Sequence, residues 1–495
     1  MQERTIMIDF AKVRITSKED YEQLLDIIDE THIDEEVVWS LKENIGEKCE
    51  VLLVEYPYYE KDYLSTYYSF YSKQHGVHSK FCFRIHFLGK MDSRDHKREY
   101  FGYISLREGM KKTKIGKSYL SPKLLINEDQ EAYLMLDSFS ASVYGERMYV
   151  SAFPWMKQET DISVCAHVAM WSILRYYGNR YKGHRDTVMG EIVDMVQNDR
   201  GRKIPSRGLT PDQIVDTLDL YNFSPVLLGD EHHKLHYFIN EIIAYIESGI
   251  PIVATMNRKR HAIALFGHGK VDYKRLDGNI DLLKEPGSDI ILHSSLISTV
   301  YAIDDNHFPY RQIDSDIPFS DKNIDYALRE INYIIIPYCQ KVLLGFNEIY
   351  EKFMAIVRQK IMKWDGIKIC RIYLTTANSF KEKAAKNSRM NEELKRRILL
   401  MDMPRFIWCI DLASIDESKK GMISGRAIAD STVGTQDEHP WLLMHDRKTI
   451  NAVEYDRELR RIPCEIEPYW LYENNLQDIK GVKIYKTDIW EKIYD

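Results

Sequence analysis

Hydrophobic residues recur with a helical period near the start of the chain and with strand-like patterns soon after it. In "SKEDYEQLLDIIDETH" they fall at Tyr21, Leu24, Leu25 and Ile28, which predicts a helix with an acidic first turn. Three later segments, rich in β-branched and aromatic residues, are predicted to be strands: "KCEVLLVEYPYY", "KFCFRIHFLG" and "YFGYISLRE". Residues 1–150 are therefore expected to form an α+β unit.

Residues 151–345 show a different order, with helices first and strands afterwards. One helix is expected to begin near Ser163, with Ser163 or Asp161 as its cap, and to end at Gly178. Two more are expected in "TPDQIVDTLDLY", capped by Thr210, and in "HYFINEIIAYIESG". The strands that follow are "IPIVATM", "HAIALFGHGKV", "STVYAID" and "INYIIIPYCQKVLL". This order is typical of an α+β domain.

Residues 346–495 again contain segments with helical periodicity and segments with the pattern of strands. "FNEIYEKFMAIVRQKIMKW" has helical spacing, and "SFKEKAAKNSRMNEELKRRILLM" is predicted to be one charged helix. "RFIWCIDLA" and "SGRAIADST" are predicted strands. The expected organisation is a central α+β domain over residues 151–345, with α+β accessory domains over 1–150 and 346–495.

Composition limits the classes of partner and compartment. The chain has 495 residues with 68 Lys and Arg against 75 Asp and Glu, a formal net charge of −7. A negative total gives no general attraction to nucleic acid or anionic lipid, so neither is an expected partner. The start "MQERTIMIDFAKVRIT" lacks the apolar run of a signal peptide, and no apolar stretch has the length of a membrane span. Seven scattered cysteines without a CxxC pair indicate a reducing cytoplasm.

Cys165 stands where an apolar helix is expected to begin, in "ETDISVCAHVAMWSILRYYGN". The positive end of a helix dipole stabilises a thiolate, which favours a nucleophile at this position. The alternative is a small buried residue, because free cysteines are often buried.

A cysteine nucleophile needs a histidine base and a group that orients the base. His261 opens the predicted strand "HAIALFGHGKV", and Asp304 and Asp305 follow the strand "STVYAI". Histidine and acid on successive strands have the geometry in which a carboxylate holds an imidazole beside a thiol. Successive strand residues point to opposite faces, so one of the two aspartates is expected to face His261, and the other to serve the turn "DNHFP".

The three segments around these residues resemble the papain-like cysteine peptidase superfamily and are most similar to the bacteriocin-processing peptidases and their relatives, over about residues 155–310. The resemblance implies a papain-like core, in which the cysteine-bearing helix packs on an antiparallel sheet. It implies Cys165 as nucleophile, His261 as general base and acid, and Asp304 as the orienting acid. The flanking regions, at "YFGYISLRE" and "IADST", resemble uncharacterised bacterial proteins that carry this core.

The same family usually has a glutamine six residues before the cysteine, whose side chain donates to the oxyanion. Here that position is Glu159, and Gln158 lies one residue earlier. A carboxylate would repel a developing oxyanion, so we expect Gln158 to be the donor, together with the backbone N–H of Cys165.

Other motifs do not indicate a cofactor or metal. "GMKKTKIGKS" has the wrong glycine spacing for a phosphate loop, and the set His75, His78, Cys82 and His86 runs into an apolar strand. The expected function is hydrolysis of peptide or isopeptide bonds in a peptide or protein substrate, without cofactor. A related acyltransferase and a non-catalytic binding scaffold on the same fold are the alternatives. The sequence does not indicate an oligomeric state.

Overall fold

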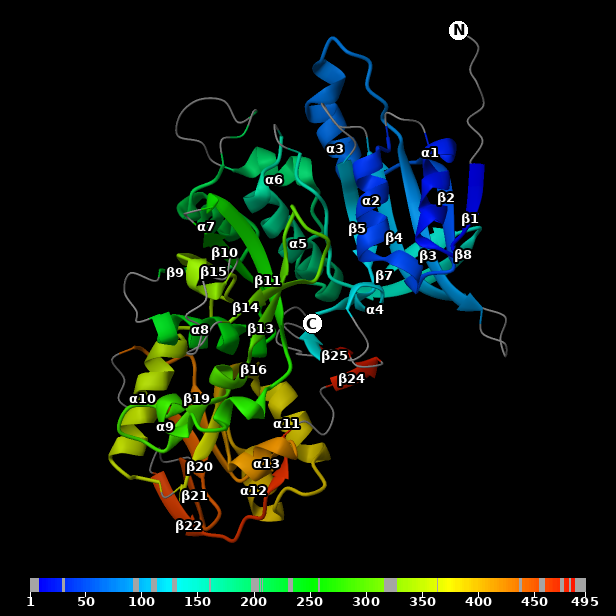
Figure 1. Ribbon diagram of the computed structural model, residues 1–495. Coiled ribbons are helices and arrows are strands. Elements are labelled where there is room, and N and C mark those ends of the chain that lie inside the picture. Colours follow the sequence, from blue (N-terminus) through cyan, green and yellow to red (C-terminus); the bar gives the residue numbers. More distant parts are fainter. Residues whose placement is uncertain are drawn as a thin grey trace.

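Three principal β-sheets with their covering helices make up the computed structural model (Figure 1). It describes residues 9–28, 32–91, 98–107, 114–126, 131–159, 162–196, 204, 206, 208–229, 235–256, 259–315, 327–362, 364–435, 439–453, 459–471, 476–479 and 482–485. The mixture of helices and sheets confirms the expected α+β class.

The first sheet is antiparallel throughout, and its strands lie in chain order. Its strands are β1 (Asp9–Arg14), β2 (Val51–Tyr58), β3 (Cys82–Met91), β4 (Arg98–Arg107) and β5 (Lys114–Leu120). The hairpin β7 (Asp137–Val143) and β8 (Glu146–Ala152) follows. The helices of this part are α1 (Gln23–Ile27), α2 (Glu35–Asn44), α3 (Lys61–Ser69) and α4 (Pro122–Leu125). The helix expected around Leu24 is short, because a 3₁₀ turn (Lys18–Glu22) precedes it.

Among the described residues, the central sheet has nine strands, which come from three distant parts of the chain. Its order is β24-β25-β6-β11-β10-β15-β9, and β13 pairs with β11 and with β14. The strands are β6 (Ala132–Leu134), β9 (Val226–Gly229), β10 (Ile252–Met256), β11 (His261–Gly269), β13 (Thr299–Ile303), β14 (Arg311–Asp314), β15 (Tyr333–Ile336), β24 (Leu476–Ile479) and β25 (Val482–Tyr485). The helices of this part are α5 (Cys165–Arg180), α6 (Met189–Met195), α7 (Pro211–Leu220) and α8 (Leu235–Glu247).

The third sheet begins with a strand from the middle of the chain. β12 (Ile290–Leu292) pairs in parallel with β16 (Lys368–Thr376), and the remaining strands are antiparallel. These are β17 (Phe406–Ala413), β19 (Gly425–Asp430), β20 (Trp441–His445), β21 (Thr449–Val453) and β22 (Leu459–Pro463), and a separate pair joins β18 (Met422–Ile423) to β23 (Tyr469–Trp470). The helices are α9 (Ile280–Leu283), α10 (Phe346–Arg358), α11 (Ala377–Lys386), α12 (Glu392–Leu400) and α13 (Ile415–Lys419).

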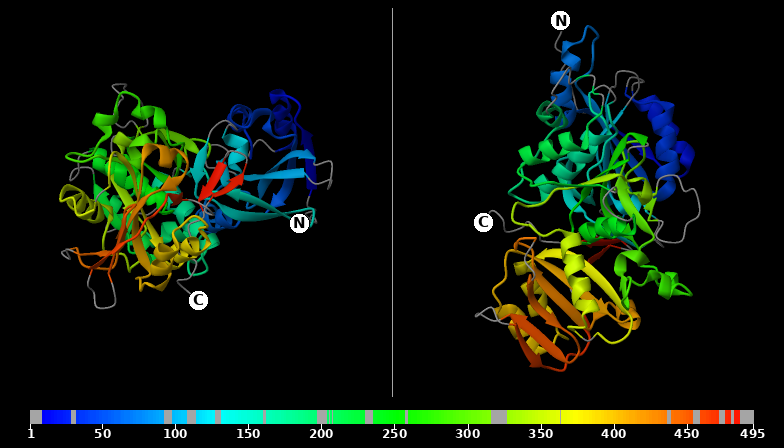
Figure 2. Two further views of the ribbon diagram at one scale, coloured as in Figure 1. Left: turned by 90° about the horizontal axis from the view of Figure 1, so that it is seen from below. Right: turned by 90° about the vertical axis from the view of Figure 1, so that its left-hand side faces the viewer.

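Sheet membership crosses the expected boundaries at residues 150 and 345. β6 precedes residue 150 and β24 and β25 follow residue 345, yet all three lie in the central sheet, where β25 pairs with β6 in parallel. The view from below places this C-terminal hairpin between the first sheet and the rest of the molecule (Figure 2). The division into three domains at these residues stays a prediction.

Helix α5 is buried along most of its length because it lies between two parts of the molecule. It packs against β11 on the side of the central sheet. Towards the first sheet, Trp171 and Arg175 donate to the Asp62 carboxylate at the start of α3, at 2.7 and 2.8 Å. The helix does not end at Gly178 as expected, but continues to Arg180. A Cβ atom at Gly178 would lie 2.8 Å from the carbonyl oxygen of Arg185, so close packing explains this glycine.

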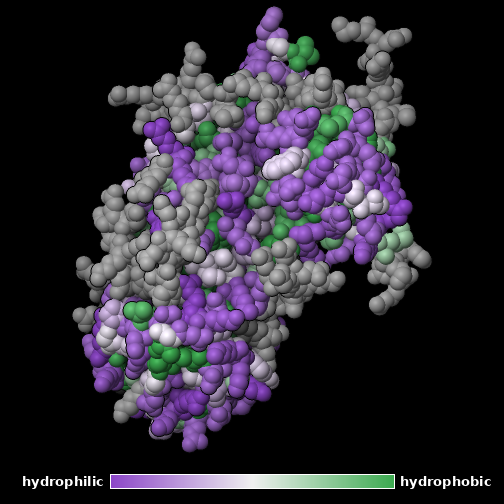
Figure 3. All heavy atoms as spheres, in the orientation of Figure 1, coloured by the Kyte–Doolittle hydropathy of each residue, from purple (hydrophilic) through white to green (hydrophobic). Residues whose placement is uncertain are grey.

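The apolar residues are divided among several buried clusters, the largest of which includes residues of the first, central and third sheets. In the view of Figure 3 the described surface is mostly hydrophilic, with hydrophobic residues in small separate groups. None of the described helices has both the length and the apolar character that a membrane crossing requires.

Candidate active site

Cys165 is the first residue of α5, and its side chain is partly exposed. The helix is not capped by Ser163, whose hydroxyl instead accepts from the backbone N–H of Glu159 at 3.2 Å. His167 Nδ1 accepts from the backbone N–H of Val164 at 3.2 Å, next to the cysteine. The Cys165 sulfur accepts from the backbone N–H of Ala262, at 3.3 Å. The thiol therefore faces the beginning of β11.

His261 is the first residue of β11 and lies beside Cys165 and Asp304. Its Nε2 atom is 2.9 Å from Oδ1 of Asp304. Burial lowers the pKa of His261, but hydrogen bonds to Asp304 and Cys165 outweigh it and raise this pKa to about 10. A carboxylate that binds one ring nitrogen favours the charged imidazolium, which in turn favours a thiolate nearby.

Asp304 directly follows β13 and is fully buried. Its Oδ1 atom also accepts from the backbone N–H of Asn306 at 2.9 Å, and its carbonyl oxygen accepts from Trp155 Nε1 at 3.1 Å. These contacts fix the Asp304 carboxylate on the turn side and its backbone on the core side.

The comparison with protein families identifies the segment that carries Cys165 and His261. Residues 150–274 match the model of the Peptidase_C39 like family. The match confirms the similarity to the papain-like cysteine peptidases related to the bacteriocin-processing enzymes. No curated protein and no solved structure matches the chain.

The C39-like segment indicates a cysteine peptidase type of hydrolase acting on a peptide or protein. It includes Cys165 and His261 but ends before Asp304, and the first sheet also lies outside it. The rest of the chain thus supplies contacts to this segment that the family match does not cover.

Asp305 is buried beside the same histidine but has a different environment. Its Oδ1 atom lies 3.8 Å from His261 Nε2, and neither carboxylate oxygen has a hydrogen-bond partner among the described residues. Burial raises the pKa of Asp305 to about 6. The expectation that Asp305 would serve the turn is wrong, because Asp304 accepts the turn N–H of Asn306 in addition to contacting His261.

Within the described ranges, one group of histidine, cysteine and acidic side chains is close enough to hold a metal ion. It consists of His261, Asp304 and Asp305, with ligand atoms within 4.8 Å of one another. The histidines and cysteine considered as metal ligands near β3 do not form such a group. His86 contacts Tyr100 and Glu55, and Cys82 is buried.

Glu159 is buried and forms an ion pair with Arg107 at the end of β4. Its backbone carbonyl accepts from the backbone N–H groups of Ile162 and Ser163, at 3.0 and 2.8 Å, which closes a tight turn before Cys165. Gln158 is half-buried, and its side chain forms no hydrogen bond with another described residue. The sequence analysis did not predict the ion pair of Arg107. A charged residue at the end of the apolar strand "YFGYISLR" is nevertheless a signal, because a buried charge needs a partner of opposite charge.

Replacing Arg107 by methionine is expected to destabilise the fold by about 3–5 kcal/mol, because the Glu159 carboxylate would stay buried without its cation. Urea denaturation of the full chain measures this loss. The double variant Arg107→Met with Glu159→Gln should recover much of it, since the uncompensated charge is then gone.

Arg98→Met is the matched control, since Arg98 lies on the same strand and pairs with Glu50 in a more exposed position. Arg98→Met is expected to lower the free energy of unfolding by less than about 1 kcal/mol. Equal losses for Arg98→Met and Arg107→Met would contradict a special role of the buried pair.

Proposed function

We propose that the chain is a cysteine-nucleophile hydrolase that cleaves peptide or isopeptide bonds through a thioester acyl-enzyme. Cys165 attacks the substrate carbonyl carbon as a thiolate. His261 donates its proton to the leaving amine as the C–N bond breaks. His261 then takes a proton from water, whose oxygen attacks the thioester and releases the carboxylic acid and the free thiol.

One observation carries this proposal: His261 lies between the Cys165 thiol and the Asp304 carboxylate. Asp304 binds Nε2 at 2.9 Å, which leaves Nδ1 as the ring nitrogen for proton exchange with the thiol. In this arrangement Asp304 is the orienting acid, because it fixes the imidazole and stabilises its charged form. The C39-like match supports a cysteine peptidase independently of this geometry.

Selective alkylation tests the nucleophile. Iodoacetamide at pH 6 should modify Cys165 before any other cysteine of the native chain, as read by peptide mass spectrometry. Cys339 and Cys464 are the matched comparisons, since both are also partly exposed and burial raises the pKa of each thiol. If either of them reacts first, Cys165 is not an activated thiol.

The oxyanion is proposed to bind the Gln158 amide and the Cys165 backbone N–H. Gln158→Ala should lower turnover about a hundredfold, because a lost oxyanion donor acts only in the transition state. Glu159→Gln should not raise turnover, since the Glu159 carboxylate already binds Arg107. Hydrolysis of a peptide substrate at saturating concentration measures the turnover of both variants.

The opposite pattern would show that the oxyanion position is one residue later. In that case Glu159→Gln would raise activity sharply and Gln158→Ala would leave it unchanged.

An acyltransferase differs from this hydrolase only in its second nucleophile, an amine in place of water. Glu159 at the expected oxyanion position favours a non-catalytic scaffold, because a carboxylate repels a developing oxyanion. The ion pair with Arg107 supplies a structural reason for that glutamate. The alkylation experiment separates the scaffold from both enzymes, because a scaffold does not require a reactive thiol.

A further inference from the structure

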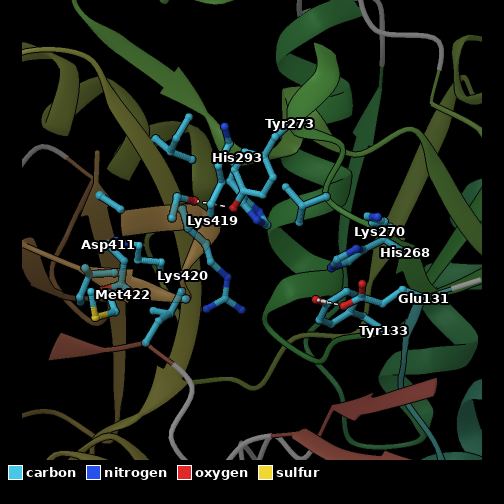
Figure 4. A pocket seen from close by; sticks show the side chains of 18 residues that line it. Glu131, Tyr133, His268, Lys270, Tyr273, His293, Asp411, Lys419, Lys420 and Met422 are labelled. Atoms are coloured by element: carbon cyan, nitrogen blue, oxygen red, sulfur yellow. Dashed lines mark hydrogen bonds between the residues drawn. The ribbon is translucent and has the colours of Figure 1, made fainter. Parts of the chain in front are cut away.

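A cavity of about 520 Å³ lies between the central and third sheets, at the opposite end of β11 from His261. Figure 4 shows its two facing walls. His268 and Lys270, at and just beyond the end of β11, belong to one wall, and Lys419 and Lys420, at the end of α13, belong to the other. Small-molecule sites typically have volumes of roughly 300–1,000 Å³, so this cavity has the size of a ligand site.

The lining carries more positive than negative side chains, although the whole chain is negative by 7. Its cations are Lys270, Arg371, Lys419 and Lys420, and its carboxylates are Glu131 and Asp411. Both carboxylates already have partners. Asp411 pairs with Arg426, and Glu131 accepts from the Tyr133 hydroxyl at 2.9 Å.

Arg371 differs from the three lysines because it has an anionic partner among the described residues. Arg371 pairs with the buried carboxylate of Glu247. Among the residues that the structure describes, neither Lys270 nor Lys420 forms an ion pair, and the Lys419 ammonium lies 5.9 Å from the centre of the Tyr273 ring. Three ammonium groups on facing walls therefore have no anionic partner among the described residues.

The cavity is held in shape by fixed contacts. The buried carboxylate of Glu247 lies 3.1 Å from His268 Nε2 and 3.3 Å from His293 Nδ1. The His268 ring stacks on Tyr133 with 4.9 Å between ring centres. Across the walls, the hydroxyls of Tyr273 and Ser418 share a hydrogen bond at 2.8 Å (Figure 4). A site that is already formed loses less entropy when a ligand binds.

We propose that this cavity binds a small polyanion whose phosphate or carboxylate groups contact Lys270, Lys419 and Lys420. Ammonium groups are point-charge donors that suit both kinds of anion. This site is separate from the proposed catalytic residues and does not depend on the proposed hydrolase activity.

Isothermal titration of the full chain with pyrophosphate and, separately, with citrate tests the proposal. Saturable binding of at least one of them is expected. The double variant Lys419→Ala with Lys420→Ala should weaken that binding about tenfold or more, because charge-assisted contacts are lost. Binding of pyrophosphate alone identifies a phosphate-bearing ligand, and binding of citrate alone a polycarboxylate.

The matched control is Lys12→Ala with Lys90→Ala, which removes the same charge from exposed lysines on β1 and β3. It should leave the affinity unchanged. The proposal is overturned if neither anion gives saturable binding, if the cavity double variant binds as tightly as the wild type, or if the control weakens binding equally. All four side chains are exposed, so the variants are expected to fold, and thermal unfolding checks this.

Discussion

Cys165→Ala should abolish cleavage of a denatured peptide library by the full chain. The thiolate is the proposed attacking group, and no other described cysteine lies against a histidine that an aspartate holds. Loss of a catalytic nucleophile reduces turnover by up to about a millionfold, which places the variant below detection. Mass spectrometry of the library products measures the effect. The free energy of unfolding should change little, because the side chain is small and partly exposed.

Cys464→Ala is the control for this result. Cys464 is also partly exposed, but it lies near Asn391 in the third sheet region, far along the chain from the C39-like segment. Its variant should cleave the library like the wild type. Retained cleavage by Cys165→Ala would rule out the proposed mechanism, even if every variant folds.

The second large effect is expected for Asp304→Ala. Without the Asp304 carboxylate, Nε2 of His261 loses its acceptor at 2.9 Å, and the imidazolium loses its counter-charge. Turnover should fall by about a thousandfold or more while KM changes little, because the carboxylate acts through the histidine and not on the substrate. Steady-state kinetics on a peptide from the library separates kcat from KM.

Asp305→Asn is the comparison, since Asp305 is the other buried acid beside His261. Its pKa in the folded chain, about 6, lies above the ordinary 3.8, so ionisation of this carboxyl destabilises the fold. The penalty is absent below about pH 4 and complete above about pH 6. Asp305→Asn should therefore raise the free energy of unfolding by about 1–3 kcal/mol at pH 8 and by little at pH 4.

The proposed roles require that replacing Asp304 and replacing Asp305 have different effects on activity. Activity of Asp305→Asn should stay within about tenfold of the wild type, since the contact from His261 to Asp304 remains. A larger loss for Asp305→Asn than for Asp304→Ala would exchange the roles of the two acids.

Local sequence patterns were sufficient to predict where a residue lies when a single helix or strand determines its position. The start of an apolar helix predicted the location of Cys165, and strand patterns predicted that His261 opens a strand and that Asp304 follows one. These positions depend on neighbours in sequence, which periodicity and capping preferences describe.

Features that depend on distant partners were not predictable in this way. The charged segment 379–401 reads as one helix, but Asn387 donates to the Trp470 carbonyl oxygen and Asn391 caps α12, so two helices form. The pairing of Arg107 with Glu159 joins residues 52 positions apart. No local spacing encodes such contacts, because tertiary packing selects them.

The mixed origin of the central sheet has a practical consequence for anyone who expresses part of this protein. A fragment limited to residues 151–345 would lack β6, and with it the strand that pairs with Gly267 to Gly269 of β11. It would also carry β12 without its partner β16. Unpaired strand edges promote aggregation. Such a fragment is therefore expected to be insoluble or to associate with itself, even though it contains Cys165, His261 and Asp304.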